Sequence, residues 1–181
     1  MAASVLKQMW FHSSNDGVQP TIERGLIAAT QGIVMPGAPM YRTTSGVWKV
    51  ATTSNATDSW QGFFSGLVDK SATWPLIAQQ DANTAIRVAL ISTNNLYVVQ
   101  VENNDSDATV GQGNVGVEYG LRVGSTAGSV GYTTLDLNNS NDTVVVVDIM
   151  SNREPSKYTT SDSPGWAVVR FLSSVIEVEK A

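Results

Sequence analysis

Hydrophobic and polar residues alternate over short stretches along most of the chain, which is the pattern typical of β-strands. The clearest case is VGVEYGLRVG at 115–124, where every second residue from Val115 to Val123 is hydrophobic. Clusters of glycine, asparagine and serine separate the stretches. The pattern predicts strands at 25–34 (a pair or one bent strand), 46–52, 60–69, 85–92, 95–102, 115–124, 131–139, 143–150 and 165–179 (one long, bulged strand or two short ones).

Short turn segments between neighbouring strands predict two hairpins. The first joins 85–92 to 95–102 across Thr93 and Asn94, and the second joins 131–139 to 143–150. The aromatic, glycine-rich stretch WQGFFSGLVD at 60–69 is typical of a bend or barrel corner.

One predicted strand is hydrophobic on both faces. In NDTVVVVDIM at 141–150, Val144 and Val146 face one way, whereas Val145, Val147 and Ile149 face the other. An exposed strand of this kind would invite edge-to-edge aggregation. We therefore expect a second sheet of the same chain or a neighbouring copy to cover its second face.

The first residues form a distinct segment. Val5, Leu6, Met9 and Trp10 would share one face of a short helix, which SSNDG at 13–17 ends. A helix this short is marginal alone, so it must dock either on its own domain or on a neighbouring subunit. One further helical turn is expected around 78–82.

These elements predict an all-β fold: a single β-barrel or β-sandwich domain of the β-tulip or jelly-roll kind, with at most one or two short helices. We assign residues 1–17 to an N-terminal arm and 18–181 to the β-domain. The length of 181 residues suits one such domain with an arm.

The composition narrows the possible functions. Charged residues make up only 15% of the chain, the net charge is −5, and the eleven basic residues are scattered. Binding to nucleic acid or to an anionic membrane surface is therefore not expected, because both need grouped cations. The absence of cysteine excludes disulfides and thiolate chemistry. No run approaches the roughly 18 apolar residues of a membrane span, and no signal peptide is evident, so we expect a protein made in the cytoplasm.

Motifs that could carry chemistry are better explained as turns. Gly111, Gly113 and Gly116 form a G-x-G-x-x-G, but an alternating strand follows them instead of the helix that a dinucleotide site requires. The loop NNDSDAT at 103–109 lacks the glycine and glutamate of an EF-hand, and a solvated hairpin loop is favoured over a cation site at Asp105 and Asp107.

Catalysis has little support in the sequence. His12 is the only histidine, and a catalytic triad would have to use it from an N-terminal segment. A carboxylate pair for glycoside hydrolysis would have to come from Asp58, Asp69, Asp81 and Glu118, whose spacing gives no indication of one. We therefore predict a protein that is not an enzyme and has no cofactor or metal.

A carbohydrate-binding β-sandwich is the main alternative function. Five tryptophans are spread along the chain, and exposed aromatic rings can bind sugars. This alternative predicts exposed side chains at Trp48, Trp60 or Trp166. Core or subunit-interface positions are the commoner use of tryptophan.

Two stretches resemble the decoration or cement proteins of tailed-bacteriophage heads. They are GVWKVATTSN with WQGFFSGLV in 46–68, and VGVEYGLRVGSTAGSVGYTTLDLNNSNDTVVVVDIM at 115–150. The resemblance implies a β-barrel or β-tulip-like domain, often trimeric, that binds the major capsid protein on the surface of a virion assembled in the host cytoplasm.

We therefore expect a virion structural protein that self-associates and binds an assembled shell. Hydrophobic residues of the arm and of the aromatic bend are the predicted contacts: Leu6, Met9, Trp10, Phe11, Trp60, Phe63 and Phe64. Deletion of residues 1–12 is expected to weaken shell binding without unfolding the domain.

Overall fold

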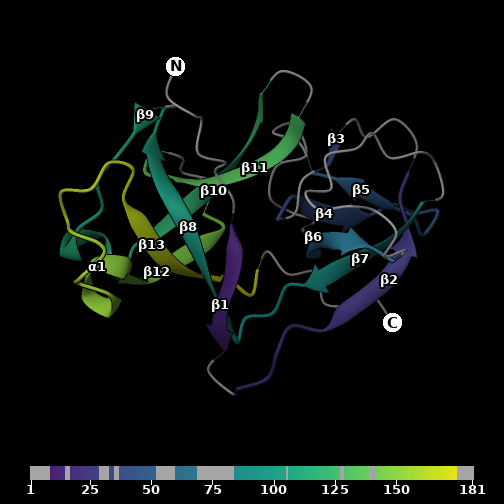
Figure 1. The fold of residues 1–181 in the computed structure, drawn as a ribbon, viewed down its shortest axis with the longest axis horizontal. Helices are drawn as coiled ribbons and strands as arrows, with labels where there is room; N and C mark the ends of the chain where they lie inside the picture. Colours follow the sequence, from purple (N-terminus) through teal and green to yellow (C-terminus); the bar gives the residue numbers. More distant parts are fainter. Residues whose placement is uncertain are drawn as a thin grey trace.

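The computed structural model describes residues 9–14, 17–28, 33–34, 37–51, 60–68, 84–104, 106–126, 129–138 and 142–174. Two β-sheets account for most of this part of the chain (Figure 1). The helical elements within it are the one-turn helix α1 (Met150–Arg153) and the 3-10 turn η1 (Gln112–Asn114). The predicted all-β fold is confirmed.

The larger sheet contains a closed barrel of five strands (Figure 1). In order around the barrel these are β8 (Asn95–Asn103), β13 (Trp166–Phe171), β12 (Val144–Ile149), β10 (Glu118–Thr126) and β11 (Ser129–Asp136). Parallel pairing of β11 with β8 closes the ring, and the other four pairings are antiparallel. Three short strands extend it: β1 (Trp10–Ser14), β3 (Ile33–Val34) and β9 (Ser106–Asp107).

The second sheet has five strands and its own small core. Its order is β2 (Ile22–Leu26), β7 (Ala85–Leu90), β6 (Gly62–Leu67), β4 (Pro39–Arg42) and β5 (Trp48–Val50). Trp48 and Phe64 are the largest side chains in that core. Gly25 allows this packing, since a Cβ atom there would lie 2.5 Å from Cδ1 of Trp48.

Aromatic side chains connect the two sheets. Phe63 on β6 lies with its ring centroid 5.4 Å from that of Tyr97 on β8 and 6.0 Å from that of Phe171 on β13. Trp60 contacts Phe171 from the same side, with ring centroids 6.3 Å apart. The stretch predicted to be a bend therefore does contain a strand with a register shift, between Phe64 and Gly66, and it anchors the junction.

The four-valine strand is covered on its second face by the chain itself. Val144 and Val146 point into the barrel core. A register shift after Val146 turns Ile149 into the same core, whereas Val147 packs against a separate cluster that includes Met150. The other members of that cluster are Leu96, Val98, Tyr158, Trp166 and Val168. The cover over Val147 is thus α1 and the segment after it, whereas Val145 is half-buried and belongs to none of the hydrophobic clusters of the described residues.

Both predicted hairpins are wrong. Strands β7 and β8 follow one another closely but belong to different sheets. Ile86 and Val88 of β7 fill the second core, whereas Tyr97 and Val99 of β8 fill the barrel core. Strands β11 and β12 are separated in the sheet by β10.

The helix predicted for the N-terminal segment is also wrong from Trp10 onward. Trp10–Ser14 is strand β1, which pairs antiparallel with β8, and Met9 just before it is 1% exposed. Hydrogen bonds to a sheet edge stabilise this short segment better than an isolated helical turn would. Residues 1–8, the helical turn expected at 78–82 and the end of the last predicted strand lie outside the described residues.

Candidate functional site

The predicted contact residues lie inside the molecule where the structure describes them. Trp60 and Phe63 belong to the aromatic junction with Met9, and Phe64 lies in the core of the second sheet. Phe11 is half-buried, with its ring edge-on to Tyr97 at 6.3 Å. These side chains stabilise the fold and do not form an outer surface.

The side chains of two predicted contact residues are not described by the structure. Leu6 lies outside the described residues. For Trp10 the structure gives the backbone position, opposite Val98 of β8.

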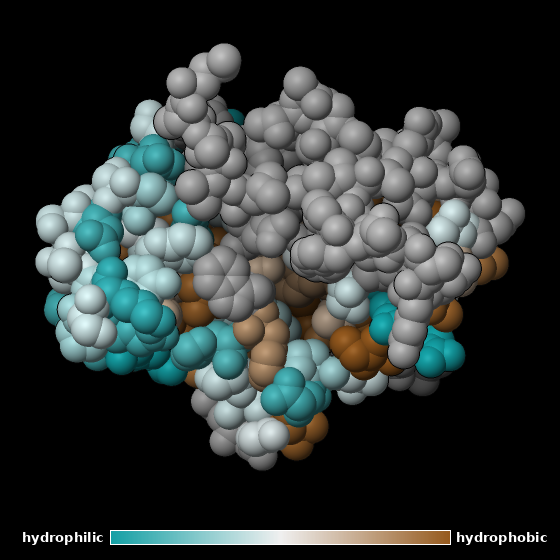
Figure 2. All heavy atoms as spheres, viewed as in Figure 1, coloured by the Kyte–Doolittle hydropathy of each residue, from teal (hydrophilic) through white to brown (hydrophobic). Residues whose placement is uncertain are grey.

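Exposed hydrophobic side chains gather instead near β2. Among the described residues, the large hydrophobic side chains most exposed are Val18 at 61%, Ile22 at 50%, Leu26 at 44% and Val117 at 39%. Figure 2 shows hydrophilic residues around the barrel and α1, and hydrophobic ones toward the side where Figure 1 places β2. Three of these four residues belong to the single segment 18–26, which sequence periodicity did not identify.

The outward-facing residues of β2 also include an arginine that faces another arginine. Ile22, Arg24 and Leu26 alternate with the more buried Glu23 and Gly25. In the register of β2 with β7, Arg24 lies directly opposite Arg87. We call Ile22, Arg24, Leu26 and Arg87 the β2–β7 outer face.

Like charges opposite one another on neighbouring strands are destabilising. Within the described residues, Arg24 has no ion pair, and Arg87 donates only a long hydrogen bond of 3.5 Å from Nη2 to the carbonyl of Val68. By contrast, Glu23 of β2 does have a partner, since it pairs with Arg42 of β4, whose guanidinium lies over the Trp48 ring at 5.0 Å. The β2–β7 outer face therefore combines exposed hydrophobic side chains with positive charge that these contacts leave uncompensated.

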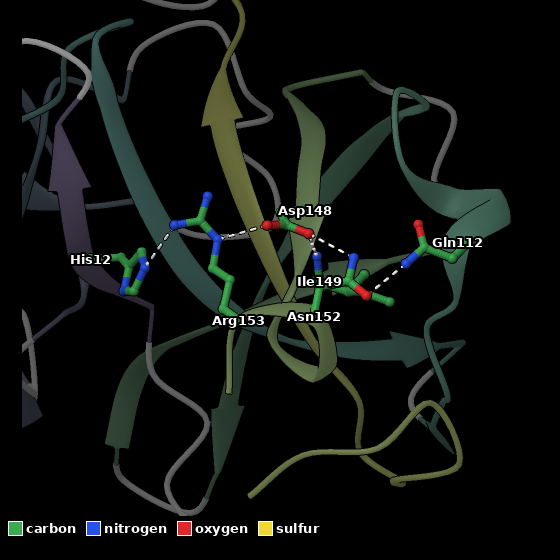
Figure 3. Close-up of polar contacts among 6 residues, drawn as sticks. All are labelled: His12, Gln112, Asp148, Ile149, Asn152 and Arg153. Atoms are coloured by element: carbon green, nitrogen blue, oxygen red, sulfur yellow. Dashed lines mark hydrogen bonds and ion pairs between the residues drawn. The ribbon is translucent and has the colours of Figure 1, made fainter. Parts of the chain in front are cut away.

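A second polar group crosses the barrel surface from β1 to η1 (Figure 3). His12 Nε2 lies 3.1 Å from Nη1 of Arg153, whose Nε donates to Oδ2 of Asp148 at 2.8 Å. Asp148 Oδ1 accepts hydrogen bonds from the Ile149 amide at 2.8 Å and from Asn152 at 2.9 Å. The series ends where Gln112 donates to Asn152 at 2.7 Å.

The pKa values of both His12 and Asp148 lie below their usual values. Burial lowers the pKa of His12, the cationic Arg153 lowers it further, and the more distant carboxylates of Glu154 and Asp148 only partly oppose this. Partial burial acts to raise the pKa of Asp148, but hydrogen bonds from Asn152, the Ile149 amide and Arg153 outweigh it, so that this pKa lies below its usual value. The group is thus built to keep His12 neutral and Asp148 ionised.

A third polar group lies on the face of the barrel wall that points away from the hydrophobic core. Gln100 and Glu102 of β8 are in register with Thr134 and Asp136 of β11, and all four are buried. Arg122 of β10 brings its Nε to 3.7 Å from Oε1 of Glu102.

The two carboxylates in this wall have different surroundings, since Oε1 of Glu102 is buried and accepts no hydrogen bond from the described residues, whereas Asp136 accepts two. Asp136 Oδ1 accepts hydrogen bonds from the backbone amides of Asn138 at 3.0 Å and Asn104 at 3.4 Å. The guanidinium of Arg122 supplies positive charge to Glu102 at a distance of 3.7 Å, which is longer than a hydrogen bond. Among the described residues, no group of three or more histidine and acidic side chains could hold a metal ion.

The geometry around His12 does not fit general-base catalysis. A triad histidine donates one ring N–H to a carboxylate, whereas the ring of His12 is in contact with a cation. Gly111 precedes η1, Gly113 lies within it, and Gly116 lies in the turn before β10. The prediction that these glycines form a turn is therefore confirmed. The loop after β8 is a tight hairpin that pairs Asn103 with Ser106, as predicted, and Asp107 on β9 is exposed.

The structure describes the tryptophans predicted for a sugar-binding site and one of the four carboxylates considered for glycoside hydrolysis. Trp48 and Trp60 are 1% and 2% exposed, so neither ring is available to a sugar, and Trp166 is half-buried beside Tyr158. Glu118 is exposed at the start of β10. Asp58, Asp69 and Asp81 lie outside the described residues.

In the part of the chain that the structure describes, no helix is long and apolar enough to cross a membrane. Models of known protein families and the curated protein sequences give no match to this chain.

Proposed function

We propose that this protein is a structural component of a virion, a decoration protein that self-associates and binds the major capsid protein on the head of a tailed bacteriophage. The observation that supports a protein-binding role best is the β2–β7 outer face, where Ile22 and Leu26 flank Arg24. Arginine and exposed hydrophobic side chains are a combination found at protein interfaces. A carboxylate from a partner would relieve the repulsion between Arg24 and Arg87.

The position of the contact surface in this proposal differs from the one expected from sequence. The aromatic bend joins the two sheets, so the β2–β7 outer face replaces it as the contact region. The role is mechanical: each subunit adds buried interface to the shell, and no bond is made or broken.

Self-association is tested first, by light scattering coupled to size-exclusion chromatography over a range of concentrations. We expect an oligomer, with a trimer as the specific prediction, and a shift to monomer in the double variant Ile22→Ser with Leu26→Ser. Val117→Ser is the matched control, because Val117 is a similarly exposed hydrophobic residue on the barrel side. A wild-type protein that stays monomeric at high concentration would contradict self-association.

Shell binding is tested separately, by co-sedimentation of the purified protein with empty phage heads. The wild type and the Val117→Ser control are expected to sediment with the heads, and the double variant is expected to remain in the supernatant. Equal binding by all three proteins would show that the β2–β7 outer face is not the contact.

A further inference from the structure

The contact between His12 and Arg153 has a property that follows from the donor chemistry of the two side chains. Arginine has only N–H donors, so the 3.1 Å contact from its Nη1 requires His12 Nε2 to act as an acceptor. The contact therefore exists only while the imidazole is neutral, with its proton on Nδ1. Protonation would remove the acceptor and place two cations side by side.

Arg153 is not free to move away from a protonated His12. Its Nε is fixed by Asp148 at 2.8 Å, and Asp148 is itself held by the Ile149 amide and by Asn152. Figure 3 shows Arg153 between His12 and Asp148, with the carboxylate on its far side. The cation thus belongs to the barrel and α1, whereas the imidazole belongs to the N-terminal strand.

Strand β1 is attached weakly at this point. The register between β1 and β8 shifts between Phe11 and Ser13, so His12 lies outside the regular ladder. The remaining attachment is a few backbone pairs, the edge-on contact of Phe11 with Tyr97, and the burial of Met9. The contact between His12 and Arg153 adds to this attachment at the centre of the strand, where the backbone ladder is interrupted.

We propose that the His12–Arg153 contact is an acid-sensitive latch, which holds strand β1 on the barrel at neutral pH and releases it when His12 is protonated. Release would uncover Met9 and the edge of β8 at Asn95–Val98, while the barrel itself stays folded. An open strand edge of this kind can accept a strand from another chain.

Burial and the charges around His12 place the switch below the usual imidazole pKa. Arg153 opposes protonation, and Glu154 and Asp148 favour it. On the β8 side the ionisable neighbour is Tyr97, whose pKa is raised by burial, so it stays neutral. Because the pKa of His12 is lowered on folding, the stabilisation by neutral His12 is complete above the usual value of 6.5 and is lost as the pH falls below it.

Hydrogen exchange of the full chain, read as protection factors corrected for the intrinsic exchange rate, tests the latch. Between pH 7.5 and 4.5, we expect protection of the β1 amides and of their β8 partners to fall by roughly tenfold, the scale of losing one charge-assisted hydrogen bond. Amides of β12 and β13 should keep their protection. Uniform protection of β1 across this range would overturn the proposal.

Two variants separate the latch from general acid sensitivity. His12→Gln keeps a hydrogen-bond acceptor but does not titrate, so its β1 protection should be the same at both pH values. Arg153→Gln removes the cation, and its His12 resonances in NMR should titrate at a higher pH than those of the wild type. A His12→Gln protein that still loses β1 protection on acidification would exclude His12 as the sensor.

Discussion

The two sheets differ in how far their outward hydrophobic residues are buried. On the barrel, Val147 of β12 is covered by Met150 and Trp166 from the segment that follows the strand. On the second sheet, Ile22 and Leu26 of β2 remain about half exposed, beside two arginines in register. A strongly hydrophobic strand is therefore not by itself a sign of a protein interface.

The difference lies in the side chains that adjoining segments of the same chain place over each strand. After β12, a turn of helix and a polar loop bring Tyr158 and Trp166 back over the strand, and the Asp148–Arg153 ion pair fixes the start of that segment. The outward residues of β7 beside β2 are Arg87 and two alanines, which cover little. The surface that we propose to bind a partner is therefore the one with modest hydrophobicity and two arginines in register.

The largest effect is expected where the two sheets meet. Phe63→Ala removes a buried ring that contacts Trp60, Tyr97 and Phe171, and should lower the free energy of unfolding by about 3–5 kcal/mol. Urea denaturation followed by tryptophan fluorescence measures this. If the two sheets were independent, the wild type would unfold in two separate steps. A single transition in the wild type that splits into two steps in the variant would show that the junction joins them.

The two faces of the four-valine strand give a smaller and more discriminating effect. Val146→Ala leaves a cavity in the barrel core and should cost about 2 kcal/mol, whereas Val147→Ala, at a half-buried position, should cost about 1 kcal/mol. The two losses of stability can be compared through the urea midpoints of the variants, provided that the dependence of the unfolding free energy on urea is the same in both. An effect near zero for Val147→Ala would mean that α1 and its following segment do not cover the strand.

The all-β class was predictable from sequence because alternation is a local property. Strands Ala85–Leu90 and Trp166–Phe171 fall within the predicted stretches, and Asn95–Asn103 extends one residue beyond the predicted 95–102. Their pairing was not predictable, since a short connection is compatible with a hairpin and equally with a crossing from one sheet to the other. Which core receives Ile86 and which receives Tyr97 depends on the whole chain.

The candidate sites depend on contacts that are distant in sequence. Arg24 and Arg87 become neighbours only through the register of β2 with β7, and His12 and Arg153 are separated by 141 positions. Neither pair has a spacing that a motif could capture. The aromatic residues of the bend were predicted to contact another protein, because composition does not distinguish a junction within one chain from an interface between chains.

Removal of the charge on Asp148 tests how firmly the cover over β12 is held. Asp148→Asn should lower stability by roughly 1 kcal/mol at neutral pH, because the ion pair with Arg153 is lost. The pKa of Asp148 is lowered on folding, so the wild type has this stabilisation above the usual value of 3.8 and loses it as the pH falls further. Thermal unfolding curves of the two proteins should therefore approach one another as the pH falls below 3.8, and a difference that stays constant through this range would assign the effect to packing.

Charge reversal on the other sheet should have the smallest effect on stability and the opposite sign. Arg24→Glu places a carboxylate opposite Arg87, and a favourable cross-strand pair should raise the free energy of unfolding by about 0.2–1 kcal/mol. The same change removes the positive charge that a partner carboxylate would meet, so self-association should weaken while the monomer becomes more stable. Arg170→Glu is the matched control, since Arg170 is exposed on β13 of the barrel. A destabilised Arg24→Glu monomer would show that Arg24 is already compensated within the chain, and the β2–β7 outer face would then lose its electrostatic reason for binding a partner.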